Sequence, residues 1–187
     1  MNRSSISGFL IFPILLALTL SFHGVNGGPL EDNCKTLASI GLPYNSCVTN
    51  LQADPRSKNA DLYELGLISL NLTRANAAYI KARAQKLLND QGRGADIRIK
   101  RVLQACVHIY FLAIEDTNDG IKSFVSKGYS GTRNSMSGVA DSGGTCEDGF
   151  IQFNFTSPLT KENNNFLQMA DIPLTIAYWL ECRGTCT

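Results

Sequence analysis

The side chains best suited to chemistry in this sequence are six cysteines spread along the chain. An even number of thiols is typical of a disulfide-stabilised exported protein, although sequence alone does not fix which of them pair. A zinc site is the alternative, but zinc needs closely spaced cysteines and histidines, and His108 is the only histidine after residue 27. Disulfides are therefore the better interpretation of Cys34, Cys47, Cys106, Cys146, Cys182 and Cys186.

The scarcity of histidine also limits catalysis. A nucleophile needs a base within hydrogen-bond reach, and no serine stands near His108 in the sequence. Glu115 and Asp116 are adjacent, as are Glu147 and Asp148, so on a helix the two carboxylates of each pair point about 100° apart and do not share one site. We interpret both pairs as solvated helix surface, and we expect no catalytic residue, no metal site and no cofactor.

The N-terminus has the features of a secretory signal peptide. Arg3 is followed by an apolar run from Phe9 to Phe22 and then by the small residues around Gly27. The run contains Pro13 and is shorter than the ~20 apolar residues that a bilayer-spanning helix needs. The sequence thus predicts a signal peptide over 1–27, no membrane anchor, and a secreted single domain over 28–187.

The charge balance argues against nucleic acid as a partner. Without Arg3 the chain has 16 Lys and Arg against 16 Asp and Glu, so there is no basic surplus to release counterions from phosphates. One local basic cluster exists, and we interpret it as the solvated start of a helix. It comprises Arg93, Arg98, Lys100 and Arg101.

Apolar residues at steps of three and four predict four long helices. The first runs from Asp61 to Leu88, and the second begins near Ile99 after the Gly92–Gly94 break. Cys106 lies on the buried stripe of the second helix, so we expect its partner on the third. The first stripe comprises Leu62, Leu65, Ile68, Leu72, Ala75, Tyr79 and Ala82, and the second Ile99, Leu103, Cys106, Tyr110, Ala113, Thr117, Ile121 and Phe124.

The third and fourth helices are less regular. The third is expected over Tyr129–Phe153 with an interruption at Gly143–Gly144. The fourth begins near Ser157 or Thr160, which could cap it, and carries Phe166, Met169, Ile176 and Leu180 at helical spacing. Because an interior proline removes a backbone hydrogen bond, Pro173 predicts a kink or a break between Met169 and Pro173.

The segment before these helices predicts a helical hairpin. The turn Gly41–Tyr44 lies between Cys34 and Cys47 and would bring the two sulfurs together, so local pairing is expected. Strand signals are absent from the pattern. The predicted fold is all-α, an up-and-down four-helix bundle over 57–181 with an N-terminal hairpin over 28–56, stabilised by disulfides.

Two Asn-x-Thr sequences are candidate glycosylation sites in a secreted chain. They are Asn71-Leu72-Thr73 and Asn154-Phe155-Thr156. Leu72 belongs to the expected core stripe, so Asn71 beside it would face water. Either asparagine is a candidate acceptor.

Over about residues 29 to 181 the chain resembles the plant invertase and pectin methylesterase inhibitor family. The likeness rests on the order and spacing of several features together. They are the hairpin from Cys34 to Cys47, Ala53–Ser57, Asp61–Leu62 with Leu65–Gly66, the mid-helix Cys106, and Thr145–Phe150.

The resemblance implies a four-helix bundle with bridges Cys34–Cys47 and Cys106–Cys146. It also implies a non-catalytic, monomeric protein of the cell wall or apoplast that inhibits pectin methylesterase or invertase by covering the substrate cleft one to one. A rigid, disulfide-pinned bundle suits this role, because it loses little entropy on binding.

Target preference in the family depends on the connection before the third bundle helix. Invertase inhibitors carry Pro-Lys-Phe there, whereas this chain has Ser126–Ser130, which keeps an aromatic as Tyr129 but has no proline before its lysine. This difference favours pectin methylesterase slightly over invertase, with a non-inhibitory binding or signalling module as the alternative of another class. The target-binding candidates are Asp116, Asp119, Lys127 and Tyr129.

The last two cysteines depart from the family pattern. Cys182 and Cys186 are separated by three residues and either form a small bridge or leave a thiol that could link two molecules. We favour the intramolecular bridge.

Overall fold

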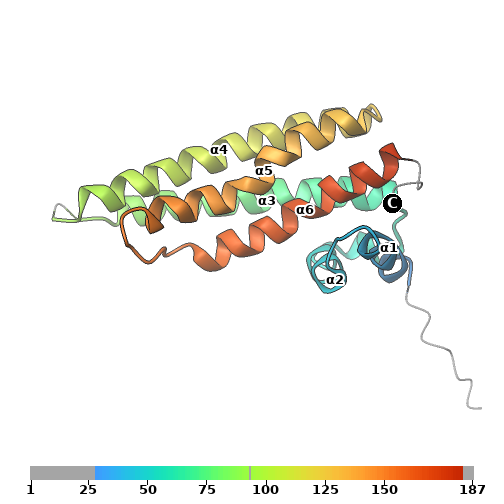
Figure 1. Cartoon of the computed structure of the whole chain (residues 1–187), viewed down its shortest axis with the longest axis horizontal. Coiled ribbons are helices and arrows are strands. Elements are labelled where there is room, and N and C mark those ends of the chain that lie inside the picture. Colours follow the sequence, from blue (N-terminus) through green and yellow to red (C-terminus); the bar gives the residue numbers. More distant parts are fainter. Residues whose placement is uncertain (1–27, 93, 183–187) are drawn as a thin grey trace, which may run out of the picture.

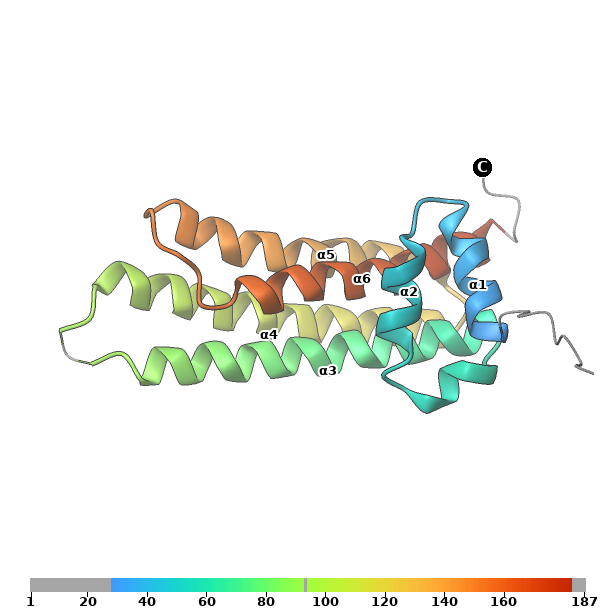
Figure 2. The same cartoon turned by 90° about the horizontal axis from the view of Figure 1, so that it is seen from below.

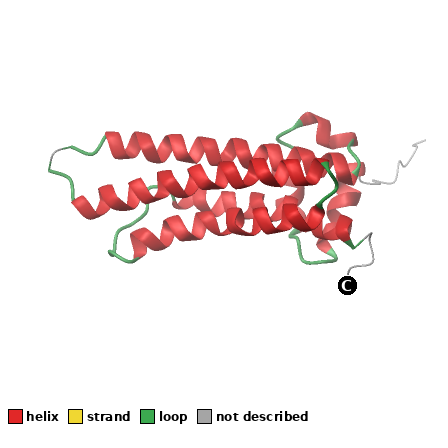
Figure 3. Cartoon of the chain, turned by 90° about the horizontal axis from the view of Figure 1, so that it is seen from above, coloured by secondary structure: helices red, strands yellow, loops and turns green. Residues whose placement is uncertain are grey.

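A computed structural model describes residues 28–92 and 94–182, which fold into a helical bundle with a helical hairpin packed beside one end (Figure 1). Within these residues there are helices and loops but no strands (Figure 3). The all-α prediction is confirmed, and the predicted signal peptide over 1–27 lies outside the described residues. The elements are α1 (Pro29–Ala38), α2 (Tyr44–Leu51), the 3-10 helix η1 (Pro55–Asn59), α3 (Leu62–Asn89), α4 (Ile97–Val125), α5 (Tyr129–Ile151) and α6 (Thr160–Glu181).

The four long helices α3 to α6 run up and down in sequence order (Figure 1). The α4–α5 connection and the end of α6 lie at the bundle end that carries α1 and α2, whereas the α3–α4 and α5–α6 connections lie at the opposite end (Figures 1 and 2). We call the end that carries α1 and α2 the hairpin end and the opposite end the far end.

The hairpin turns at Gly41, whose φ of 107° favours glycine. Cys34 and Cys47 are fully buried and joined by a disulfide across the two helices. A second disulfide joins Cys106 of α4 to Cys146 of α5 in the bundle core. These are the two pairings that the family resemblance implies. The predicted Cys182–Cys186 bridge stays a prediction, because Cys186 lies outside the described residues.

Helix α3 begins with a capping box. The Asp61 carboxylate accepts the Glu64 N–H at 2.8 Å, and the Glu64 carboxylate accepts the Asp61 N–H at 3.0 Å. The expected stripe is correct only in its first part, because Ala75, Tyr79 and Ala82 are exposed. The buried positions from there on are Thr73, Ala77, Ile80 and Ala84.

Polar residues explain this error. Ser69 and Thr73 are buried because their hydroxyls donate to helix carbonyls, Ser69 to Gly66 O at 2.8 Å and Thr73 to Ser69 O at 2.9 Å. A helix face predicted from apolar residues alone does not include Ser69 and Thr73, although both are buried.

Helix α5 continues through Gly143 and Gly144, so the expected interruption is wrong. Gly143 is buried, and a Cβ built there would lie 2.5 Å from the Asn163 carbonyl oxygen of α6. The glycine therefore permits a close approach of two helices and does not end one.

Helix α6 likewise continues through Pro173, so the predicted break is wrong, and the alternative of a kink stays a prediction. Pro173 has no N–H to donate to the Met169 carbonyl one turn earlier. The Thr73 hydroxyl of α3 lies 3.5 Å from that oxygen, but its shorter hydrogen bond, at 2.9 Å, goes to Ser69 O of its own helix.

Candidate target-binding surface

The α4–α5 connection is a tight helix terminus with a fixed shape. Lys127 has a φ of 61°, in the left-handed region, and its N–H donates to Phe124 O at 2.9 Å. The Gly128 N–H donates to Ser123 O at 2.8 Å. Together these bonds form a Schellman motif, which usually has glycine at the left-handed position. The backbone thus holds the exposed Lys127 at the hairpin end of the bundle.

Tyr129 is packed at the start of α5. Its ring centroid lies 5.4 Å from that of Phe124, which itself stacks on Tyr63 at 5.2 Å. The side chain is half-buried, and this burial raises the pKa of the Tyr129 hydroxyl. The ring is therefore part of an aromatic cluster that closes this end of the bundle.

Asp116 and Asp119 are exposed on α4. The Asp119 carboxylate accepts a hydrogen bond from Lys122 Nζ at 2.8 Å. Partial desolvation, with the negative charges of Asp119 and Glu115, raises the pKa of the Asp116 carboxyl. This stretch of α4 presents an acidic face.

The structure brings two of the four predicted binding residues together. Lys127 and Tyr129 line one open cavity of about 540 Å³ with Leu180 and Glu181 of α6, and Asp116 and Asp119 do not line it. The Glu181 carboxylate is held by Arg133 at 2.6 Å. The candidate surface thus has a polar cavity at the hairpin end and a separate acidic face on α4.

Sequence reasoning missed an aromatic surface between α3 and α4. A cavity of about 480 Å³ there is lined by His108 and Phe111 of α4 and Lys81 of α3, among others. The Phe111 ring stacks beside His108 at 6.4 Å, and Lys81 Nζ lies 5.6 Å from the ring centroid. The sequence contained an indication of this exposed surface, because the apolar residues Phe111 and Leu112 lie outside the predicted buried stripe of α4.

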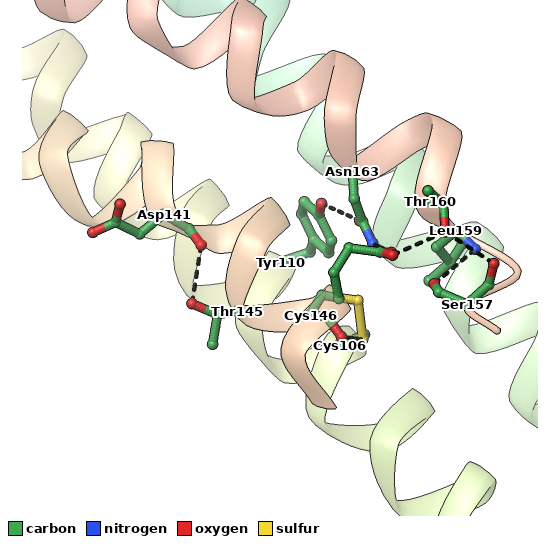
Figure 4. Close-up of a disulfide and its surroundings, with 10 residues drawn as sticks. Cys106, Tyr110, Asp141, Thr145, Cys146, Ser157, Leu159, Thr160 and Asn163 are labelled. Carbon is green, nitrogen blue, oxygen red and sulfur yellow. Dashed lines mark hydrogen bonds between the residues drawn. A yellow bond between two sulfur atoms is a disulfide. The ribbon is translucent and has the colours of Figure 1, made fainter. Parts of the chain in front are cut away.

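A buried polar network lies next to the Cys106–Cys146 disulfide (Figure 4). The Tyr110 hydroxyl of α4 donates to Asn163 Oδ1 of α6 at 2.6 Å. The Asn163 amide donates to the Glu147 carboxylate of α5, which also accepts from the Thr160 hydroxyl at 2.8 Å. Burial and the charges of Glu147 and Glu162 raise the pKa of Tyr110.

This network corrects the interpretation of Glu147 as solvated helix surface. The carboxylate is half-buried and joins α5 to α6, because the Asn163 amide and the Thr160 hydroxyl supply its donors. Glu115, Asp116 and Asp148 are exposed.

The two candidate glycosylation sites differ in setting. Asn71 is half-buried in the middle of α3, where its amide donates to Leu67 O at 2.7 Å and accepts from Arg74 at 2.9 Å. Asn154 is exposed at the far end in the left-handed region, with a φ of 57°. The geometry favours Asn154, and modification of either site stays a prediction.

No group of three or more His, Cys, Asp or Glu side chains in 28–92 and 94–182 is arranged to hold a metal ion. No helix in the described part of the chain has the length and apolar content to cross a membrane. The basic residues at the start of α4 include Arg98, which pairs with the helix-capping Asp96 at 2.6 Å.

The helical bundle and its hairpin, each with one buried disulfide, define a class of small disulfide-stabilised helical proteins. The family model described as "Plant invertase/pectin methylesterase inhibitor" matches residues 30–176. The chain belongs to this family.

Individual relatives support the same assignment. The chain is 35% identical over 158 residues to a protein of Platanus orientalis named "Putative invertase inhibitor", covering 83% of this chain and 91% of that one. It is 31% identical over 175 residues to "Pectinesterase inhibitor 12" of Arabidopsis thaliana, covering 92% and 99%.

A solved structure supports the fold. The crystal structure of a mutant form of a pectin methylesterase inhibitor from Arabidopsis superposes with a TM-score of 0.67 at 20% identity, covering 81% of this chain and 96% of that one. The family and the relatives together support an inhibitor of pectin methylesterase or invertase.

Proposed function

We propose that the protein is a secreted inhibitor without catalysis of its own, which binds pectin methylesterase one to one and covers its substrate cleft. Membership of an inhibitor family supports the class. Two disulfides and short connections support the mechanism, because a preorganised binding surface loses little conformational entropy when it docks.

The α4–α5 connection is the observation that carries the choice of target. Invertase inhibitors of the family place Pro-Lys-Phe at this position. Here Lys127 occupies a left-handed turn position, and the Tyr129 ring packs on Phe124 at 5.4 Å. An aromatic ring held in the bundle is poorly placed to insert into a deep cleft, so this feature favours the esterase.

Inhibition of invertase is the second candidate function. The name of the Platanus relative, at 35% identity, favours it. Tyr129 could then replace the phenylalanine as a polar aromatic that covers the cleft without entering it. Both candidates use the hairpin end of the bundle, with Lys127 and Tyr129 in contact with the enzyme and Asp116 and Asp119 contributing from the separate acidic face of α4.

The test is a parallel titration of the protein against a plant pectin methylesterase and a plant cell-wall invertase between pH 5 and 7. We expect esterase activity to fall to its minimum near an equimolar ratio, with invertase unaffected. Inhibition of invertase alone would support the second candidate. A folded protein that inhibits neither enzyme would contradict both and favour a non-inhibitory binding module.

One substitution tests the surface itself. Lys127→Gly removes the side chain while glycine accepts the left-handed backbone, so the turn is preserved. We expect it to weaken inhibition by up to about fivefold, the scale of one exposed charged contact at an interface. Lys86→Ala, near the far end of α3, is the control and should inhibit like the wild type. Equal inhibition by the glycine variant and the wild type would exclude Lys127 from the interface.

A further inference from the structure

Helix α2 passes beside α3 and α6 (Figure 2). Amide side chains from these helices line a groove there. Asn45, Thr49 and Asn50 line it from α2, and Asn165 and Gln168 line it from α6. Its volume of about 350 Å³ is at the lower end of the roughly 300–1,000 Å³ range of small-ligand sites. Apart from the Asn50 amide, which donates to Ser46 at 2.8 Å, these side chains make no hydrogen bonds within the described part of the chain.

Asn76 of α3 connects this groove to a second cavity of about 200 Å³, because it lines both. Its Oδ1 is buried and accepts no hydrogen bond from any described residue. A buried acceptor without a donor is unfavourable, because it has lost its hydrogen bond to water and gained none in return. No described partner holds the amide in this orientation, so Oδ1 would gain a hydrogen bond from a donor placed in the groove.

The second cavity adds an aromatic ring and a positive charge. Tyr79 lines it and is 57% exposed, although its position in the sequence suggested the core. Lys161 makes no ion pair with any residue in the described ranges, whereas Glu162 beside it is held by Arg83 at 2.8 Å. This end of the groove therefore carries one uncompensated positive charge.

Each of these features matches part of one ligand class. Amide side chains both donate and accept, as sugar hydroxyls do. An exposed aromatic ring offers an apolar face on which a sugar ring can pack. An unpaired lysine attracts a carboxylate.

We propose that the groove binds a short oligosaccharide that carries carboxylates, an oligouronide. The amides of α2, α3 and α6 bind its hydroxyls, Tyr79 packs against one ring, and Lys161 faces a carboxylate. The site shares no lining residue with the α4–α5 connection, so the proposal does not depend on the inhibitory function.

The test measures binding of a trimer of galacturonic acid to the isolated protein at pH 5.5, with a neutral glucose trimer as the matched ligand. The readouts are calorimetry and the side-chain amide signals in a ¹⁵N–¹H NMR spectrum. We expect the acidic trimer to bind more tightly than the neutral one and to shift the amides of Asn76, Asn165 and Gln168. No shift of these amides, or equal binding of the two trimers, would overturn the proposal.

Two exposed positions provide variants that preserve the fold. Lys161→Gln should weaken binding of the acidic trimer about fivefold and leave the neutral trimer unchanged, whereas Lys58→Gln, outside the groove, should change neither. Asn165→Ala should weaken both trimers. If the acidic trimer binds Lys161→Gln and Asn165→Ala as it binds the wild type, the ligand lies elsewhere and the assignment is wrong.

Discussion

The buried side chain of Asn163 links three helices of the bundle by hydrogen bonds. Its amide accepts from Tyr110 at 2.6 Å and donates to Glu147, so one side chain joins α4, α5 and α6 (Figure 4). Sequence could not reveal this role, because its partners lie 53 and 16 residues away and an asparagine in a helix gives no sign of facing inward. The half-buried Glu147 was misread for the same reason.

Replacing Asn163 should lower stability by leaving its partners unsatisfied. We expect Asn163→Ala to lower the free energy of unfolding by about 1–3 kcal/mol in urea denaturation. Asn164→Ala, at an exposed neighbouring position, should change it by no more than about 0.5 kcal/mol. Equal stabilities of the two variants would mean that the network contributes nothing.

Asp171 makes stability depend on pH. Burial and then the charge of Asp141 raise the pKa of its carboxyl above the unfolded value of about 3.9. The native state therefore holds this proton to higher pH than the unfolded state. The contribution of Asp171 to stability is thus most favourable below about pH 4 and becomes less favourable as pH rises through the native pKa.

Asp171→Asn should remove that loss. Its Tm, relative to wild type, should be higher at pH 7 than at pH 3.5 in parallel thermal melts. Asp148→Asn, which removes an exposed carboxylate, controls for the change in net charge. A difference in Tm that does not vary with pH would show that Asp171 ionises equally in both states.

At the scale of the helix, periodicity predicted the elements well and their contacts less well. The four long helices were found because their apolar stripes recur every three or four residues over many turns. The stripe of α3 drifted because Ser69 and Thr73 are buried with their hydroxyls satisfied internally. The predicted interruption of α5 and the predicted break of α6 were wrong. A glycine or a proline in the sequence does not show how a neighbouring helix packs against it.

Gly143 and Gly144 of α5 allow a test of the close helix packing, because only one of them contacts a neighbouring helix. Gly143→Ala should destabilise the protein, because the new Cβ would lie 2.5 Å from a backbone oxygen of α6 and force two helices apart. Gly144→Ala should stabilise it by about 1 kcal/mol, since a Cβ there meets nothing within 4 Å and alanine favours the helix. Chemical denaturation of both variants decides the point, and effects of the same sign would contradict the packing described here.

At the scale of the whole molecule, two disulfides close loops of different length. The sulfurs join residues 13 and 40 positions apart. In the chain-entropy model, loss of Cys34–Cys47 should lower the free energy of unfolding by about 3 kcal/mol, and loss of Cys106–Cys146 by about 4 kcal/mol. Paired Cys→Ser variants measured by urea denaturation would test this, and a larger loss for the hairpin bridge would contradict the order.

The paired variants should also differ in what unfolds. The hairpin lies at one end of the bundle, so its bridge supports α1 and α2, whereas the second bridge lies in the core between α4 and α5 (Figures 1 and 4). We expect hydrogen exchange to increase mainly over 29–51 in the first variant and across the four long helices in the second. An identical pattern in the two variants would show a single cooperative unit.

The two ends of the bundle differ in a way that matters for handling the protein. The loop that holds the exposed Asn154 is at the far end, opposite Lys127 and Tyr129 (Figure 1). A fluorophore or biotin attached at position 154 would therefore leave the α4–α5 turn facing the solution on a sensor chip. Lysine-directed coupling, which can also modify Lys127, would cover that turn in part of the immobilised molecules and lower the apparent binding capacity.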